Sequence, residues 1–395
     1  MKYTAEPYEF NLVEGGFLFE VGSLVDVLGG LHDRRDARGL RYALVTVLVY
    51  VVLAKLSGEH SLRGIAQWVE LRANKLADML GLEKAQAPHA TTYSRILGEA
   101  VSAEELEQVS REFFTTPQPG EKALMAIDGK VIRGTIPAGR SQGVHLLAAY
   151  LPDEGVVLAQ VEVMPGENEI PAAARLLRMV DLRGKIVTGD AILAQRELSK
   201  QIVKAGGDYL WTIKGNQPDT REDIQVLFEP EAQAKGFAPA KRRFGTEAKT
   251  EKGHGRLEKR SIKISSALKG YLDWPHAEQV FRIERRVRRL VDGKESNEVA
   301  YGITSLTSQE APPAELLALV RRHWAIENSL HYCRDDTLRE DRCTLRTGTA
   351  ARAIAAINNL LLGLLRHGGV TNVPDARRRF AARLEEAWQL ISLTP

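Results

Sequence analysis

Five short apolar runs between residues 123 and 213 constrain the fold of this chain more than any other feature. The runs are interpreted as strands and lie at residues 123–127, 144–151, 156–164, 185–188 and 208–213. The first three follow one another directly, whereas helical patterns at 170–180 and 193–205 separate the last two from what precedes them. A meander of three strands followed by alternating helix and strand predicts an α/β domain with a mixed sheet.

The length and composition describe a folded protein of more than one domain. At about 150 residues per domain, a chain of 395 residues is expected to form two or three. Apolar residues make up 44% and charged residues 27%, which excludes disorder over most of the chain. The net charge of +3 does not by itself require a nucleic-acid partner. Only two cysteines, Cys333 and Cys343, are present, which excludes a disulfide scaffold and fits a reducing compartment.

No segment reads as a targeting or membrane-spanning sequence. The N-terminus carries Glu6 and Glu9 and has no apolar stretch, unlike a signal peptide. The longest apolar run, residues 42–54, has 13 uncharged residues between Arg41 and Lys55, whereas a bilayer span needs about 20. We therefore expect a buried helix there, no membrane partner and a cytoplasmic protein.

The regions on either side of the strands read mainly as helical. The expected organisation is an N-terminal helical domain at 1–115, the first part of the α/β core at 116–225, a β-rich insertion at 226–310, a core helix at 311–345 and C-terminal helices at 346–395. Within these bounds, helices are expected at 314–338, 349–366 and 376–391, and strands at 256–264 and 298–306. The insertion also carries two basic stretches, 241–243 and 281–290.

Residues 61–100 have the pattern of a helix-turn-helix. A short helix and a turn precede a helix that Thr91 or Thr92 could cap, and Ser102 with Glu105 forms a capping box for the next one. Such a motif would contact DNA, although a plain helical bundle uses the same pattern. Both interpretations stay open on the sequence alone.

Three acids occupy positions suited to metal-dependent chemistry. Asp128 is expected at the end of the first strand, Asp190 at the end of the fourth, and Glu327 inside the helix at 314–338. Strand ends on one sheet edge are where α/β proteins place reactive groups. Oxygen ligands suit Mg²⁺ or Mn²⁺, and two such ions about 4 Å apart can activate water and stabilise the leaving oxygen of a phosphodiester. With 51 acids in the chain, a chance arrangement is the alternative.

Each acid has cationic or amide neighbours that could hold phosphate. These neighbours are Lys130, Arg133, Lys214, Asn216, Gln217, Arg322, His323, Asn328, His331 and Arg334. On local sequence alone, a solvated hairpin at 130–133 and a polar turn at 214–217 explain two of the groups equally well.

The late helix carries polar residues at a spacing of three or four. They are His323, Glu327, His331 and Arg334, which would share one helical face. A zinc site from the two histidines and Glu327 fits poorly, because all three would rise in a row along one helix. An exposed face of intrahelical ion pairs is another interpretation. Trp324 and Ile326 are expected in the core, where they would seat the helix on the sheet.

One further pattern, GRSQG at 139–143, matches the GxSxG nucleophile elbow of serine hydrolases. That elbow needs a strand before it and a helix directly after it. Here the segment lies between two expected strands, so a hairpin loop is the better interpretation, and an esterase using Ser141 is kept only as an alternative.

Four separated segments together resemble a known family. They are MAIDGKVIRGT, IVTGDA-x-LAQ, GGDYLWTIKGNQP, and RRHWAIENSLH with the later REDR. In this order they resemble the DDE transposases of bacterial insertion sequences, in particular the ISAs-type family and the related H-repeat proteins. The stretch 33–58, with IAQWVE and ATTYSRIL, is similar to that family's associated N-terminal domain. The resemblance runs from about residue 24 to about residue 365.

This resemblance implies an RNase H-like core interrupted by a β-rich insertion. It implies that Asp128 bridges two Mg²⁺ or Mn²⁺ ions, while Asp190 and Glu327 each complete one of them. Lys130, Arg133, Lys214 and the face at 322–334 would position phosphates. The implied reaction is metal-dependent cleavage of the element's DNA ends, followed by attack of the freed 3′-hydroxyl on target DNA. The implied partners are DNA and further copies of the chain, at least a homodimer on DNA.

One departure from the broader group concerns the residues around the last acid. That group has a Tyr-x2-Arg-x3-Glu-x6-Lys pattern, whereas Val320, His323 and Arg334 occupy the corresponding places here. The tyrosine is absent, and the positive charge of the lysine is kept by Arg334. Two alternatives to a transposase stay open: a metal-dependent nuclease, and a DNA-binding protein that keeps the fold without turnover.

Overall fold

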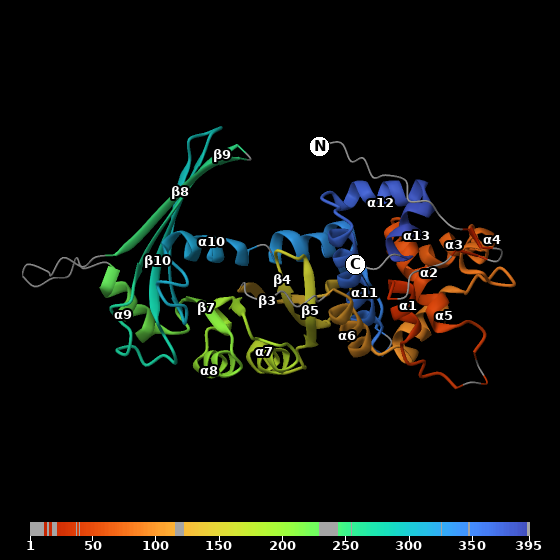
Figure 1. Ribbon diagram of the computed structural model, residues 1–395, viewed down its shortest axis with the longest axis horizontal. Helices are drawn as coiled ribbons and strands as arrows, with labels where there is room; N and C mark the ends of the chain where they lie inside the picture. Colours follow the sequence, from red (N-terminus) through yellow and green to blue (C-terminus); the bar gives the residue numbers. More distant parts are fainter. Residues whose placement is uncertain are drawn as a thin grey trace, which may run out of the picture.

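The computed structural model describes residues 12–13, 16–17, 22–36, 38, 40–114, 122–228, 244–253, 255–324, 326–346 and 348–392. The basic stretch 241–243 lies outside the described residues. A long sheet crosses the molecule, with a body of helices at one end and the strands of the insertion at the other (Figure 1).

The nine strands of this sheet have a mixed order. From one edge to the other they are β5 (Val156–Glu162), β4 (His145–Leu151), β3 (Ala123–Val131), β6 (Lys185–Gly189), β7 (Asp208–Ile213), β11 (Glu295–Thr304), β10 (Gln279–Arg289), β9 (Arg256–Ser265) and β8 (Gly245–Gly253). Strand β6 pairs in parallel with β3 and β7, and every other pairing is antiparallel. The expected α/β class with an RNase H-like mixed sheet is confirmed, and the insertion strands extend this sheet beyond β7.

Alternating side chains of the central strands bury both faces of the sheet. Leu124, Ile186 and Leu210 pack with α10 (Pro313–His323), which covers one face. The intervening residues belong to a second apolar cluster that includes α7 (Glu169–Arg178) and α8 (Arg196–Lys204) on the other face. Burial on both faces explains why these strands read as continuous apolar runs.

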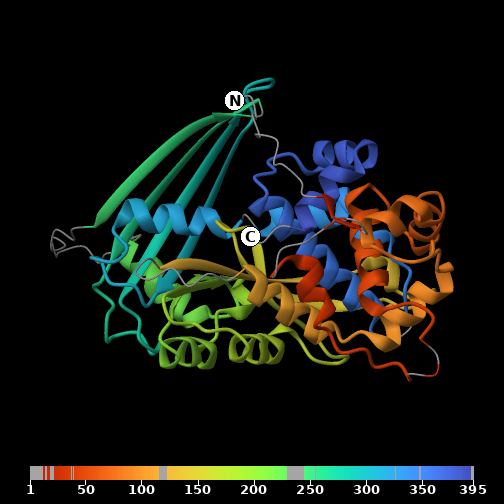
Figure 2. The ribbon, with the colours of Figure 1, turned by 45° about the vertical axis from the view of Figure 1, so that its right-hand side comes forward.

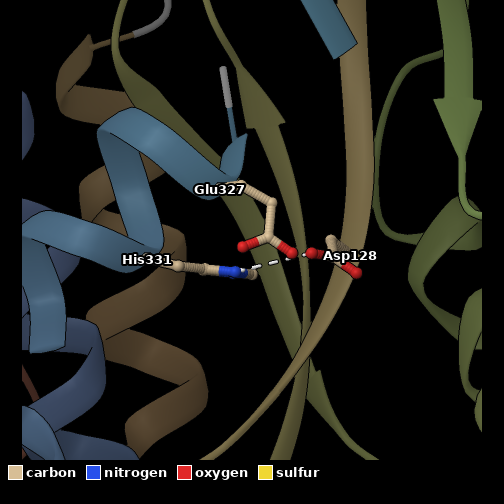
Figure 3. A group of neighbouring side chains, drawn as sticks. All are labelled: Asp128, Glu327 and His331. Carbon is tan, nitrogen blue, oxygen red and sulfur yellow. Dashed lines mark ion pairs between the residues drawn. The ribbon is translucent and has the colours of Figure 1, made fainter. Parts of the chain in front are cut away.

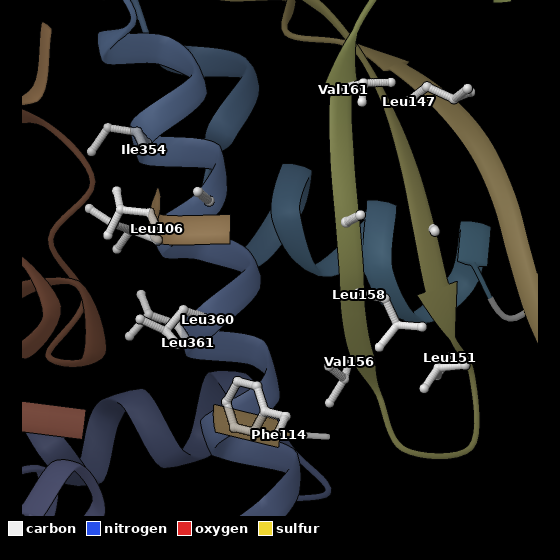
Figure 4. Packing of buried hydrophobic residues seen from close by; sticks show 14 of the residues in the cluster. Leu106, Phe114, Leu147, Leu151, Val156, Leu158, Val161, Ile354, Leu360 and Leu361 are labelled. Atoms are coloured by element: carbon white, nitrogen blue, oxygen red, sulfur yellow. The ribbon is translucent and has the colours of Figure 1, made fainter. Parts of the chain in front are cut away.

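The N-terminal and C-terminal helices form one body against the β5 edge (Figures 1 and 2). They are α1 (Leu24–Gly29), α2 (Leu44–Leu56), α3 (Leu62–Glu70), α4 (Ala73–Leu80), α5 (Ala90–Arg95), α6 (Ala103–Phe114), α11 (Ala350–His367), α12 (Val373–Ala382) and α13 (Leu384–Ser392). Figure 4 shows Leu106 of α6 and Leu361 of α11 packed in the cluster that also contains Leu158 of β5. Helix α2 is buried along its length, as expected, and no described helix is long and apolar enough to cross a membrane.

Two expected helices are interrupted. The helix expected at 314–338 ends as α10 at His323, and two π-helical turns follow, Ile326–His331 and Cys333–Thr337. The helix expected at 376–391 is two helices, α12 and α13, because the backbone at Arg383 leaves the helical region (φ −132°, ψ 86°). Periodicity alone did not reveal these breaks, because apolar residues continue on both sides of each one.

Strands β8 and β10 and helix α9 were not expected, and one cap differs. Strand β8 is an edge strand of sequence GTEAKTEKG whose side chains are mostly exposed, so it has no apolar alternation to detect. Helix α9 (Pro218–Phe228) follows the turn after β7. Helix α5 is capped by His89 rather than by Thr91 or Thr92, and the helix-turn-helix interpretation stays a prediction.

A buried polar network joins the helical body to the sheet. Its centre is an ion pair between Arg334 and Glu340, whose side chains are both 0% exposed. Every guanidinium nitrogen of Arg334 donates a hydrogen bond, to Glu340 at 2.6–3.0 Å and to Gln160 of β5 at 3.2 Å. Asn358 of α11 donates to Glu340 at 2.7 Å, and Gln160 donates to Glu107 of α6 at 3.3 Å. Burial raises the pKa of Glu340, but Arg334 and Asn358 outweigh it and hold that pKa below its ordinary value.

Loss of one partner of this pair should be strongly destabilising. We expect Arg334→Met to lower the free energy of unfolding by about 3–5 kcal/mol, because Glu340 would stay buried and unpaired. Adding Glu340→Gln should restore part of the loss, since the uncompensated charge is then removed. Urea denaturation measures both effects. Arg183→Met, which removes an exposed pair with Asp181, is the control and should change little. Equal losses for Arg183→Met and Arg334→Met would contradict the central role of the network.

Candidate active site

Asp128 and Asp190 lie side by side where two parallel strands stop pairing. The pairing of β3 with β6 ends at Ile127 and Gly189, and each acid is the next residue along its strand. Strand β3 itself continues beside β4 to Val131. Asp128 therefore lies inside the strand, whereas it had been expected at the strand's end. The carboxylate of Asp190 accepts a hydrogen bond from the backbone N–H of Ala191 at 2.7 Å, which caps a short 3₁₀ turn.

The first π-helical turn brings Glu327 and His331 to Asp128. The imidazole Nδ1 of His331 is 3.4 Å from a carboxylate oxygen of Asp128. One ligand atom from each of the three residues lies within 4.8 Å of the other two (Figure 3). We call these three side chains the acid–imidazole group. Ile326 and Leu330, each 1% exposed, anchor the turn in a cluster that includes small alanines of β3 and β4.

Asp190 is near the acid–imidazole group but not part of it. Its side chain is 61% exposed, and its carboxylate lies 3.5 Å from the ammonium of Lys214. Two of the three expected acids therefore meet, together with a histidine, while the third stands at the end of the neighbouring strand beside a cation.

The electrostatics of the group favour a bound cation. Burial raises the pKa of Asp128 to about 7, against the opposing hydrogen bond from the N–H of Gly129, and the charges of Glu327, Glu169 and Asp190 raise it further. Burial also lowers the pKa of His331 to about 3, so the imidazole is neutral near pH 7. A neutral imidazole beside two carboxylates is a donor set that divalent cations take. The residues present therefore fit a divalent metal ion.

Two expected phosphate contacts are instead structural. Arg334 is the buried partner of Glu340, and the side chain of Lys130 is only 7% exposed, paired with Asp335 and Asp341. The acidic partners lie within or just after the late turns, so the local sequence around Lys130 gave no sign of them. Neither cation is available to a phosphate.

The turn after β7 also uses its amides internally. The side-chain NH₂ of Asn216 donates to the carbonyl of Ala191 at 2.6 Å, and that of Gln217 donates to the carbonyl of Ala194 at 3.1 Å. Both bonds hold the segment that follows Asp190. These amides therefore position the loop that carries the acid, and the expected contact of Asn216 and Gln217 with DNA stays a prediction.

The other expected cations have varied surroundings. Arg133 is 82% exposed with one long-range partner, Asp341 at 3.4 Å, and Lys214 is 64% exposed. Arg322 pairs with Asp153. His323 ends α10 outside the acid–imidazole group, so the row of ligands along one helix does not form. The side chain of Asn328 lies outside the described residues.

A cavity beside Asp190 was not foreseen. It has a volume of about 130 Å³ and lies between the central strands and the C-terminal end of α10. Trp324, expected in the core, is instead 40% exposed here, and the guanidinium carbons of Arg260 and Arg285 lie 5.9 and 5.1 Å from its ring centroid. Ile326 is buried as expected. Arg285 belongs to the basic stretch 281–290, which folds as β10 and so presents alternate residues to one face.

The hydrolase elbow is not formed. Ser141 lies in the connection between β3 and β4, which contains a short 3₁₀ turn but no helix after the serine. The hairpin interpretation of GRSQG is correct.

Comparisons with known proteins give one consistent family. A family model described as "Transposase DDE domain" matches residues 119–364, and a second, described as "DDE_Tnp_1-associated", matches residues 25–114. The protein YbfL of Escherichia coli K12 is 28% identical to this chain, over 93% of this chain and 96% of its own length. YhhI of the same strain is 27% identical over the same shares, and its name describes it as an H repeat-associated candidate transposase.

Two other matches differ in how similar they are to this chain. YncI of Escherichia coli O157:H7, also named as a candidate transposase, is 28% identical over 88% of each chain. Among solved structures, a piggyBac transposase synaptic complex with hairpin DNA aligns with 93% of this chain and 78% of its own. Its identity is 9% and its TM-score 0.38, an overlap too loose to bear on function.

The raised pKa of Asp128 predicts that, without a metal ion, ionisation of this carboxyl lowers the free energy of unfolding of the protein. Asp128→Asn should become more stable relative to the wild type as the pH rises from about 4 to about 7, because the unfolded chain ionises first. Above that range the gap should be constant, at no more than about 4 kcal/mol. Denaturant unfolding in EDTA at several pH values measures the gap.

The control for this experiment is Asp181→Asn, whose exposed carboxylate has a pKa lowered by Arg183 and should give no such gain. A stability difference between Asp128→Asn and wild type that is the same at pH 4 and pH 8 would show that the pKa of Asp128 is not raised in the folded protein.

Proposed function

Because this chain belongs to the family of transposases with a DDE domain, we propose that it cleaves the DNA ends of an insertion sequence and transfers them to target DNA. The observation that carries this proposal is the meeting of Asp128 and Glu327 from segments about 200 residues apart, with Asp190 at the adjacent strand end. Hard oxygen ligands from three separate elements are what phosphodiester chemistry with Mg²⁺ or Mn²⁺ requires.

The three acids would have distinct roles. Asp128 would bridge two divalent ions, and Asp190 and Glu327 would each complete the coordination of one. When bound, such ions activate a water molecule and stabilise the leaving oxygen of the cleaved strand. The backbone N–H of Ala191 donates to the carboxylate of Asp190 and helps to orient it. The side-chain amides of Asn216 and Gln217 hold the loop that follows Asp190 in place. The buried turn anchored by Ile326 would hold Glu327 above Asp128.

Exposed cations near the acids would hold the DNA backbone. Lys214 and Arg133 are expected contacts that stay exposed. The ammonium of Lys214 lies 3.5 Å from the carboxylate of Asp190, and Arg133 follows Asp128 by five residues along the chain. Beside Asp190, the cavity is also lined by Trp324, whose exposed ring could stack on a base. Arg260 and Arg285 line the same cavity, but both are half-buried and paired with Glu258. A local concentration of positive charge can bind DNA although the whole chain carries only +3. Because two element ends must be joined, the active assembly would be at least a homodimer on DNA.

One observation favours an alternative function. Asp190 faces Lys214 and stands outside the acid–imidazole group, an arrangement compatible with a DNA-binding protein that lacks turnover. A metal-dependent nuclease that cuts without joining uses the same acids. Variants of the three acids separate catalysis from binding.

Each acid should be essential for cleavage and dispensable for binding. Asp128→Asn, Asp190→Asn and Glu327→Gln should each lower the rate of DNA cleavage by more than about 100-fold, since even outer partners of metal ligands contribute 10–100-fold. Their affinity for the same DNA should change little, because each removes a metal ligand and no phosphate contact. The assay uses duplexes from the gene's flanking DNA, with Mg²⁺ or Mn²⁺ against EDTA, and Asp181→Asn as the exposed control. Normal cleavage by any of the three variants would refute its assignment.

Lys214 should contribute one phosphate contact. The logarithm of the affinity for duplex DNA falls with the logarithm of salt concentration by about 0.9 for each contact. We expect Lys214→Ala to reduce this slope by about one. Lys204→Ala, an exposed lysine at the end of α8, should leave it unchanged. Fluorescence anisotropy at several salt concentrations gives both slopes, and identical slopes for wild type and Lys214→Ala would remove Lys214 from the interface.

A further inference from the structure

His331 is oriented toward the two acids by the fold of its own turn. Its side chain is 9% exposed and comes from the last residue of the π-helical turn that also carries Glu327. A π-helical turn is wider than an α-helical one, so residues four apart no longer stand directly above one another. As a result His331 points beside Glu327 at Asp128, and not along a common helical stripe (Figure 3).

The two nitrogens of this imidazole have different surroundings. Nδ1 faces Asp128 at 3.4 Å and lies within the 4.8 Å group. Nε2 is buried and has no hydrogen-bond partner among the described residues. Here the nitrogen directed at the carboxylates is the one placed to act.

We propose that His331 supplies an imidazole nitrogen ligand to the metal ion held by Asp128 and Glu327, so that this site is a mixed nitrogen–oxygen site. The inference rests on the proposed function in one respect only, that a divalent ion binds between the two acids. Imidazole favours transition metals, whereas Mg²⁺ prefers oxygen ligands alone. The site should therefore bind Mn²⁺ more tightly than Mg²⁺, and His331 should be the source of much of that preference.

The test is direct detection of nitrogen bound to Mn²⁺ in the full-length protein, with and without a DNA duplex. Pulsed electron paramagnetic resonance should show ¹⁴N modulation from a coordinated imidazole in the wild type. Labelling the histidines with ¹⁵N should remove that modulation without any mutation. His331→Gln should abolish it and weaken Mn²⁺ binding by about 10-fold or more, with a smaller effect on Mg²⁺. His323→Gln is the matched control and should keep the signal.

Each outcome decides the inference. Manganese that binds without ¹⁴N modulation, but is lost in Asp128→Asn, would refute the ligand role of His331 and leave the three-acid site standing. A signal that persists in folded His331→Gln, or disappears in His323→Gln, would assign the nitrogen elsewhere. If the wild type binds no Mn²⁺ even with DNA, both this inference and the proposed function fail.

Discussion

The buried ion pair between Arg334 and Glu340 is the interaction on which the arrangement of this molecule depends. It ties β5, α11 and, through Gln160, α6 to the turns that follow α10. A buried ion pair is tolerated only when its hydrogen bonds are completed. Because the partners come from β5, α11 and the turns after α10, these elements must keep the positions that complete those bonds. That placement sets the segment carrying Glu327 and His331 over β3. The helical body is therefore part of the framework that completes the acid–imidazole group.

The central fold could be predicted because its signals are local. Strands buried on both faces give continuous apolar runs, and the five runs from 123 to 213 correspond to β3–β7. The predictions failed where the structure depends on features that the local sequence pattern does not carry. Strand β8 is polar and exposed, and the break after His323 interrupts a sequence that is periodic on both sides. Pairing partners far along the chain, such as Asp341 for Lys130, turned an expected phosphate contact into an internal one.

The candidate site was predictable to a similar degree. Asp128 and Asp190 each come one residue after the last pair of the parallel β3–β6 ladder, so their nearness follows from the strand order. The orientation of Asp190 toward Lys214 depends on the turn after β7, and the approach of His331 depends on a π-helical turn. Neither has a signature in residue spacing. Trp324 had been expected in the core because it is an apolar residue at the end of a helix. Its exposed position beside Arg285 depends on strand β10, which the sequence around Trp324 does not reveal.

One set of carboxylates would serve both cleavage and joining, and joining is the step that distinguishes a transposase from a nuclease. The most direct measurement offers the protein a pre-cut duplex from the gene's flanking DNA together with a supercoiled plasmid. We predict covalent joining that requires Mg²⁺ or Mn²⁺ and a 3′-hydroxyl on the duplex, with none from a 3′-deoxy end. A protein that cleaves intact flanking DNA but joins neither end would contradict the account and identify a nuclease.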